Sequence, residues 1–123
     1  MNKNLLTAPM GWNSWDCYGA AVDEETVRKN AEFMAKNLKQ YGWEYVVVDI
    51  QWSNPTAPNH EYQPFTELCI DEYSRLIPTE ERFPSAKGGK GHRLRNMFIR
   101  LDLSSAYILC EEFRVRRSTA TLA

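Results

Sequence analysis

The stretches MGWNSWD, at residues 10–16, and EYVVVDIQW, at residues 44–52, decide the fold of this chain. Each is a short apolar segment that ends in a carboxylate and an indole. An apolar run with a charge at its end is typical of a buried strand in a parallel sheet, where functional side chains gather at the carboxyl edge. We therefore expect two neighbouring parallel strands with a site where they end.

The segment between the two stretches has the pattern of an amphipathic helix. Asp23 is a suitable N-cap, and two glutamates follow it in the first turn, where they stabilise the helix dipole. Gly42 is placed to stop the helix. The apolar residues at helical spacing are Val27, Ala31, Met34, Leu38 and Tyr41. With strands at about residues 11–15 and 43–50, the second buried on both faces, this predicts a βαβ unit.

A long loop is predicted after the second strand. Prolines and asparagines between residues 53 and 64 exclude regular structure there. Residues 68–78 have the pattern of a small hairpin that turns at residues 71–74. The glycines at residues 88–91 match neither GxxxxGK[ST] nor GxGxxG, so they do not predict a phosphate loop.

Composition excludes several classes of protein. The chain has 123 residues, 43% of them hydrophobic, and a formal net charge of -1, so no overall charge favours nucleic acid or a membrane surface. Its N-terminus has no apolar signal segment or membrane span, so a cytoplasmic location is expected. Cys17, Cys69 and Cys110 are odd in number and do not predict a disulfide framework. His60 and His92 lack metal or triad spacing, and neither a metal nor a cofactor is expected.

Together, the two quoted stretches resemble the opening of glycoside hydrolase family 27, the α-galactosidases (melibiases). The resemblance runs from Ala8 to about Gly91. It implies an α/β fold, a (β/α)8 TIM barrel, which needs about 200–250 residues. We therefore expect residues 1–91 to be an N-terminal part of such a barrel: strand, helix, strand and a long loop. Secreted members carry a cysteine where Gln51 stands, and this departure agrees with a reduced compartment.

The resemblance also implies a site. Family members are retaining glycosidases, in which a nucleophile and an acid lie about 5–5.5 Å apart. Both are aspartates on later strands, so no catalytic residue is assigned to this chain and the chain itself is predicted to be inactive. By the motif match, Asp49 would accept hydrogen bonds from hydroxyls of an α-galactoside or related carbohydrate. Trp15 would form an apolar wall. Many members have a second aspartate where Ile50 stands, which weakens the prediction of strict galactose preference.

Three further residues of the two stretches have competing interpretations. Asp16 fits sugar contact and a structural role in the first loop equally well. Trp52 fits a pocket wall or packing beneath the long loop, and packing is favoured. Trp12 is interpreted as a core residue.

The segment at residues 92–123 differs in composition from the rest. From His92 onward every basic side chain is arginine, and the apolar residues fit neither a helical nor a strand period. When residues 101–118 are written as degenerate codons and regrouped from each third base, one allowed reading is GLKFGIHIMRGIPRQAV. That reading resembles the third barrel strand of the family. We infer a frameshift near His92 or Arg93, either genuine or a sequencing error, and expect a poorly ordered, out-of-frame tail.

Three classes of function follow from these patterns. The first is an α-galactosidase-type hydrolase, truncated before its catalytic aspartates. The second, preferred for the polypeptide itself, is a non-catalytic remnant with at most weak sugar binding. The third is nucleic-acid binding through the arginines of the tail, which is disfavoured because Asp102, Glu111 and Glu112 interrupt them. No protein partner is predicted.

Overall fold

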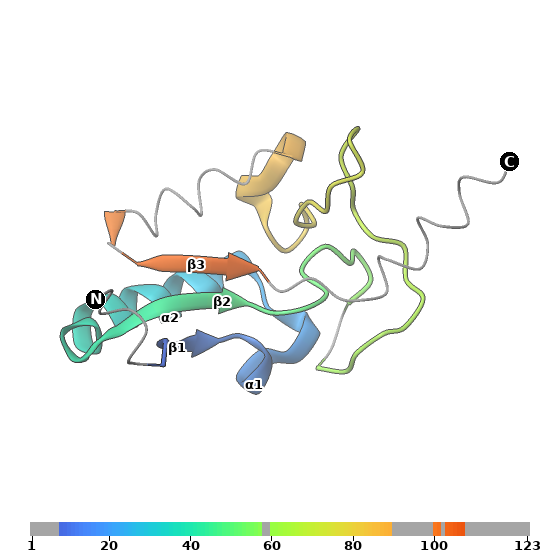
Figure 1. The fold of residues 1–123 in the computed structure, drawn as a ribbon. Coiled ribbons are helices and arrows are strands. Elements are labelled where there is room, and N and C mark those ends of the chain that lie inside the picture. The colour runs from blue at the N-terminus through green and yellow to red at the C-terminus, as the bar shows by residue number, and fades with distance from the viewer. Residues whose placement is uncertain (1–7, 58–59, 90–99, 102, 108–123) are drawn as a thin grey trace, which may run out of the picture.

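A three-stranded parallel sheet forms the centre of the computed structural model, which describes residues 8–57, 60–89, 100–101 and 103–107 (Figure 1). Its strands are β1 (Met10–Asn13), β2 (Trp43–Val48) and β3 (Ser104–Tyr107), in the order β1-β2-β3. β1 and β2 run parallel, with Trp12 opposite Val46 and Asn13 opposite Val47. The predicted pairing of the first two strands is therefore confirmed.

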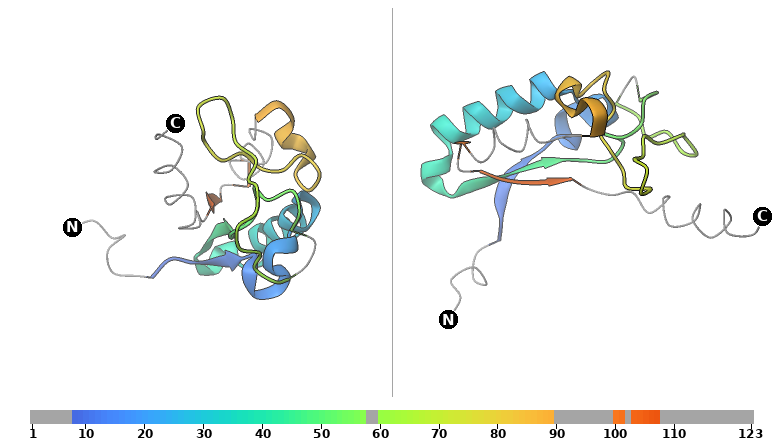
Figure 2. Two further views of the ribbon diagram at one scale, coloured as in Figure 1. Left: turned by 90° about the vertical axis from the view of Figure 1, so that its right-hand side faces the viewer. Right: turned by 90° about the horizontal axis from the view of Figure 1, so that it is seen from above.

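Helix α2 (Glu24–Asn37) lies along one face of the sheet (Figure 2). The side chain of Asp23 accepts a hydrogen bond from the amide of Thr26 at 2.8 Å, so the predicted N-cap is confirmed. Of the apolar residues predicted at helical spacing, Val27, Ala31 and Met34 are buried, but Tyr41 is 67% exposed. The predicted helix is too long, because α2 ends at Asn37 and the chain then tightens into the 3-10 helix η3 (Lys39–Tyr41). Gly42 then adopts a left-handed conformation with φ of 90°.

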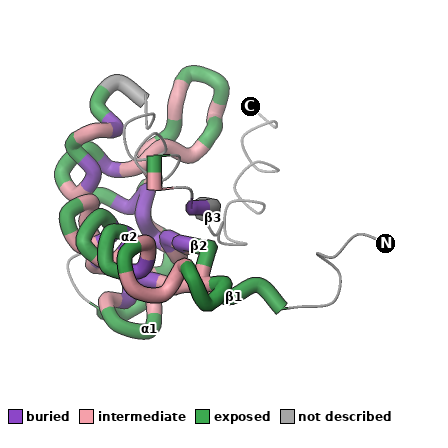
Figure 3. Tube along the Cα trace, turned by 90° about the vertical axis from the view of Figure 1, so that its left-hand side faces the viewer, coloured by how far each residue is buried: buried purple, intermediate pink, exposed green. Residues whose placement is uncertain are grey.

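Burial varies from residue to residue along strand β2, as the colours of Figure 3 show. Val46 and Val48 are almost fully buried in the core with residues of α2, whereas Tyr45 is 40% exposed. The prediction that both faces are buried is wrong for the described residues. The opposite face of the sheet has no described helix against it, and burial alternates over the last three residues of the strand, where Val47 is less buried than Val46 and Val48.

Strand β1 ends two residues earlier than predicted. Trp15, expected as its last residue, instead begins the short helix α1 (Trp15–Tyr18), which continues into η2 (Gly19–Ala21). The side chain of Asn13 accepts a hydrogen bond from the amide of Trp15 at 2.8 Å. This local bond turns the chain out of the sheet, because asparagine competes with ladder hydrogen bonding.

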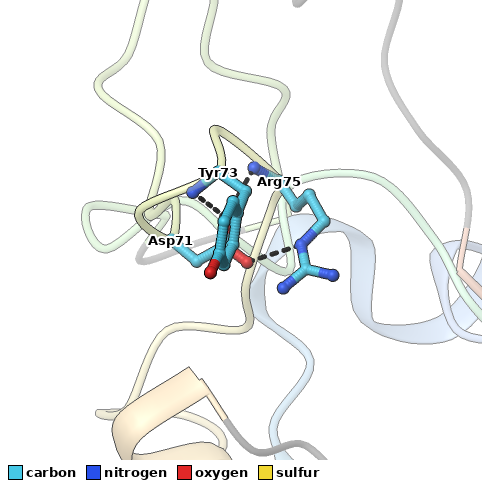
Figure 4. Close-up of polar contacts among 3 residues, drawn as sticks. All are labelled: Asp71, Tyr73 and Arg75. Carbon is cyan, nitrogen blue, oxygen red and sulfur yellow. Dashed lines mark hydrogen bonds and ion pairs between the residues drawn. The ribbon is translucent and has the colours of Figure 1, made fainter.

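The predicted hairpin after β2 is confirmed (Figure 4). The amide of Asp71 donates to the carbonyl of Arg75 at 2.9 Å, and Ile70 and Leu76 form an antiparallel bridge. The carboxylate of Asp71 accepts hydrogen bonds from the amides of Tyr73 and Arg75, both at 2.9 Å, and from Nε of Arg75 at 2.6 Å. The hairpin is followed by the 3-10 helix η4 (Pro84–Gly89).

Strand β3 lies in the segment that we interpreted as an out-of-frame tail, and sequence periodicity did not predict it. It pairs with β2 in parallel, with Tyr45 opposite Ser104 and Val48 opposite Tyr107. Leu103, immediately before it, is buried in the core. The predicted poor order of residues 92–99 and 108–123 lies outside the described residues. Within the described part of the chain, no helix is long and apolar enough to cross a membrane.

Candidate functional site at the carboxyl edge of the sheet

A buried serine joins the ends of β1 and β2. The amide of Ser14 donates to the carbonyl of Val47 at 3.0 Å, and its hydroxyl oxygen accepts a hydrogen bond from the amide of Asp49 at 2.9 Å. The Ser14 residue is fully buried. Trp15 follows directly in the chain, so the backbones of Trp15 and Asp49 lie at the same edge of two neighbouring parallel strands. That their side chains face a common space stays a prediction. Ser14 was given no role from the sequence, although a hydroxyl between Trp12 and Trp15 could have suggested a structural contact at the end of the strand.

Asp49 follows directly after β2. Val46 and Val48 are buried in the core with α2, so the alternation of a strand places Tyr45 and Val47 on the opposite side. The same alternation, extended one residue beyond β2, would place Asp49 there too. The carboxylate is half-buried, and its Oδ1 accepts the amide of Ile50 at 2.7 Å. A carboxylate offers about four lone-pair sites, so it can accept further hydrogen bonds from a ligand.

The structure distinguishes the remaining residues of the two stretches. Trp52 is only 5% exposed and belongs to the hydrophobic core, which favours packing beneath the loop over a pocket wall. Trp12 packs against the same core and meets the ring of Tyr18 edge-on, with the centroids 6.1 Å apart. Asp16 is exposed on α1. Ile50 is half-buried beside Asp49.

The histidines and cysteines are dispersed in the described part of the chain. His60 is exposed, whereas His92 lies outside the described residues. Cys17 and Cys69 are free thiols, and Cys110 is not described. Burial raises the pKa of the Cys69 thiol, so a smaller fraction of it is the nucleophilic thiolate.

Two buried contacts near the site were missed by sequence reasoning. Gln51 is 6% exposed, has a left-handed backbone with φ of 68°, and its carboxamide bonds both backbone groups of Gln63, at 2.6 and 3.0 Å. Arg82 donates to four backbone carbonyls of the loops that follow β1 and β2. Both contacts join positions far apart in sequence, and no local pattern of residues indicates them.

A parallel β/α unit with an aromatic residue and a carboxylate at its carboxyl edge is typical of barrel glycosidases. No family model matches the chain. It is 35% identical to an α-galactosidase of Coffea arabica over 81 residues, which are 65% of this chain and 18% of that enzyme.

Two solved structures share the fold. A glycoside hydrolase family 27 β-L-arabinopyranosidase from Geobacillus stearothermophilus, in complex with arabinose, is 60% identical and superposes with a TM-score of 0.78. The match covers 82% of this chain and 24% of that one. α-Galactosidase I from Mortierella vinacea is 28% identical with a TM-score of 0.63, and the match covers 87% of this chain and 23% of that enzyme. The chain thus spans about a quarter of the solved enzymes or less.

These similarities agree with the site, and they identify the chain as an α-galactosidase-like, amino-terminal segment of glycoside hydrolase family 27. The resemblance drawn from the two quoted stretches is confirmed.

Proposed function

We propose that this chain forms the first part of the glycone pocket of a family 27 (β/α)8-barrel glycosidase, with Trp15 and Asp49 in contact with the sugar. The observation that carries the proposal is the shared anchor on Ser14, which holds both residues at one carboxyl edge. The alternation along β2 supports it further, because extending it one residue beyond the strand would place Asp49 on the face that lines the interior of a barrel.

The pocket residues alone cannot complete hydrolysis. A retaining glycosidase needs a nucleophile to form the glycosyl-enzyme and a second carboxyl group to protonate the leaving oxygen. Both are expected on strands beyond those of this chain. The 123 residues by themselves would accordingly not hydrolyse a glycoside and would bind sugar weakly at most.

We also propose that residues from about His92 derive from a shifted reading frame. Strand β3 (Ser104–Tyr107) lies within the residues whose shifted reading begins GLKFGIHIM, the stretch that resembles the third family strand. Its backbone pairing with β2 supports the position of that strand in the sheet. Restoring the frame would supply the side chains of the original strand and the remainder of the barrel.

Two sugars are candidates for the substrate of the complete enzyme. An α-galactoside is expected from the family, and a β-L-arabinopyranoside is favoured by Ile50 and by the similarity to the Geobacillus enzyme. The two sugar rings share the arrangement of their ring hydroxyls, and arabinopyranose lacks only the hydroxymethyl group of galactose. An isoleucine beside Asp49 offers no hydrogen bond to that group, whereas an aspartate would.

The test compares the 123-residue chain with a frame-restored protein. We expect no release of nitrophenol by the short chain from nitrophenyl α-D-galactopyranoside or β-L-arabinopyranoside. We expect turnover of at least one of them by the restored protein. Asp49→Asn in the restored protein should reduce kcat/KM at least tenfold, since hydrogen bonds of a charged group are worth about 1.5–3 kcal/mol. Asp71→Asn, in the distant hairpin, is the matched control.

Turnover by the short chain would place the catalytic carboxylates within it and contradict the proposal. A restored protein that folds but cleaves neither glycoside would contradict the assigned substrates.

A further inference from the structure

The guanidinium of Arg82 lies between two loops that come from different strands. Its Nη1 donates to the carbonyl of Ala20 at 2.6 Å and to that of Val22 at 2.9 Å. Its Nη2 donates to the carbonyl of Asn54 at 2.8 Å and to that of Gln51. One guanidinium therefore bonds two carbonyls after α1 and two carbonyls after β2.

The backbone around Arg82 is itself fixed to helix α2. The carbonyl of Arg82 accepts the amide of Glu24 at 2.8 Å, and the carboxylate of Glu24 accepts the amide of Ser85 at 2.8 Å. The neighbouring Phe83 is buried in the core, and the guanidinium carbon lies 5.7 Å from the centre of its ring. The side chain thus reaches both loops from a rigid base.

Both loops lead directly to the proposed sugar-binding residues. Gln51 follows Asp49 and Ile50, so the bond to its carbonyl holds the peptide just beyond the carboxylate. The loop at Ala20–Val22 follows the short helix that begins at Trp15. A bond that keeps the two loops together also keeps the indole and the carboxylate at a fixed separation.

Four carbonyl acceptors on two sides suit arginine and no other side chain. The planar guanidinium carries five N–H donors in a fixed fork, whereas a lysine ammonium is a compact point charge with three donors. The position is costly to occupy, since burial lowers the pKa of the guanidinium. The nearby carboxylates of Asp23 and Glu81 act in the opposite direction and favour the charged form.

We infer that Arg82 is a positioning residue for the glycone pocket: it clamps the loop after α1 to the loop after β2 and so fixes Trp15 relative to Asp49. The positioning role of Arg82 rests on the proposed function, because it assumes that Trp15 and Asp49 bind the sugar. The clamp itself is a separate claim, which can be measured without sugar.

The first test is amide hydrogen exchange in the unmodified 123-residue chain, followed by NMR. The amide of Tyr18 bonds the carbonyl of Ser14, and the amide of Asn54 bonds the carbonyl of Gln51, so each reports on one loop. If Arg82 clamps the loops, the two amides should open in one event with the same free energy. Arg82→Gln should accelerate both at least tenfold more than it accelerates amides of α2. If the amides of Tyr18 and Asn54 opened independently in the unmodified chain, the proposed clamp would be disproved.

The second test distinguishes positioning from general stability. Methyl α-D-galactopyranoside and methyl β-L-arabinopyranoside are titrated while the Trp15 indole and Asp49 amide signals are followed. The variants are Arg82→Gln, Arg82→Lys, Arg75→Gln as a control for an exposed arginine, and Val27→Ala as a destabilised core control. We expect both Arg82 variants to reduce the sugar-dependent changes in chemical shift at least fivefold. The two control variants should leave these changes as they are, at temperatures where all the proteins are folded.

The outcomes separate the two claims. Sugar-dependent shifts that survive in Arg82→Lys, or that fall equally in Val27→Ala, would overturn the positioning role alone. No shifts in the unmodified chain would contradict sugar binding by this segment, and the exchange experiment would then still decide the clamp. If Arg82→Gln fails to fold, Arg82→Lys serves in both tests.

Discussion

Ile50 stands beside the carboxylate that we place on the sugar, so it is the residue where a change of substrate is easiest to test. Its half-buried side chain can pack against a ring that lacks a hydroxymethyl group. Ile50→Asp in the frame-restored protein should raise the ratio of kcat/KM for nitrophenyl α-D-galactopyranoside to that for the β-L-arabinopyranoside. One added hydrogen bond, worth about 1.4 kcal/mol, predicts about a tenfold change. Ile50→Val is the control, and an unchanged ratio in Ile50→Asp would remove this residue from sugar selection.

Ser14 is the second residue with a sharp expectation, because its hydroxyl oxygen accepts the amide of Asp49 in a fully buried position. Ser14→Ala should reduce the free energy of unfolding by about 1–3 kcal/mol, since it leaves the amide of Asp49 without this acceptor. Urea unfolding measures the loss. Ser85→Ala is a suitable control, because its contact with Glu24 uses the backbone amide and persists. Equal stability of the two variants would show that Ser14 does not anchor the site.

Helix α2 depends on its N-cap more than on its surface ion pair. Asp23→Ala removes the acceptor for the amide of Thr26 and should cost about 1 kcal/mol of unfolding free energy. Glu25→Gln removes the ion pair with Lys29, whose side chains are both well exposed, and should change stability within error. Thermal unfolding followed by circular dichroism compares them. A larger effect of Glu25→Gln than of Asp23→Ala would contradict the capping argument.

The hairpin at residues 70–76 should loosen in acid. Hydrogen bonds from the backbone amide of Arg75, and then from its side chain and the amide of Tyr73, hold the pKa of Asp71 below its usual range. A lowered folded pKa stabilises the hairpin fully above the unfolded value, near pH 4, and this stabilisation is lost as the pH falls through the folded pKa. The amide signals of Tyr73 and Arg75 should therefore shift together below about pH 4. In Asp71→Asn they should not, and identical titrations would refute the assignment.

The accuracy of the sequence analysis varies between these elements for physical reasons. The cap at Asp23 and the hairpin turn follow from local chemistry, and both are found. Gly42 was expected to stop the helix, but α2 already ends at Asn37, and Gly42 caps the 3-10 helix η3 instead. The early end of β1 was missed because the side chain of Asn13 captures the amide of Trp15, a competition that a hydrophobic pattern does not contain. The four-carbonyl contact of Arg82 was missed because loop residues about 30 and 60 positions apart in sequence meet only in the folded chain.

For the whole molecule, the described sheet has one covered face and one open face. Alternation along β2 puts Val46 and Val48 against the helix layer and leaves Tyr45 on the other side. In a closed barrel that second face would be filled by side chains from the other strands. If the proposed pocket lies on this open side, the strands that complete it would also bury this face of the sheet.

The frame-restored protein should consequently be more stable than the 123-residue chain and should expose less apolar surface. We expect the short chain to bind an apolar fluorescent dye such as ANS and to unfold at lower urea concentration, because apolar groups such as Tyr45 and Met10 remain accessible. Restoring the frame should remove dye binding and raise the urea midpoint, since a larger fraction of the surface is buried as a domain grows. Tyr45→Ser separates the two effects: it should reduce dye binding by the short chain, yet destabilise the restored protein by about 2–5 kcal/mol if the residue becomes a packed interior side chain. A restored protein that tolerates Tyr45→Ser without loss of stability would mean that this face is not the barrel interior, and the assignment of Asp49 to the pocket would fall with it.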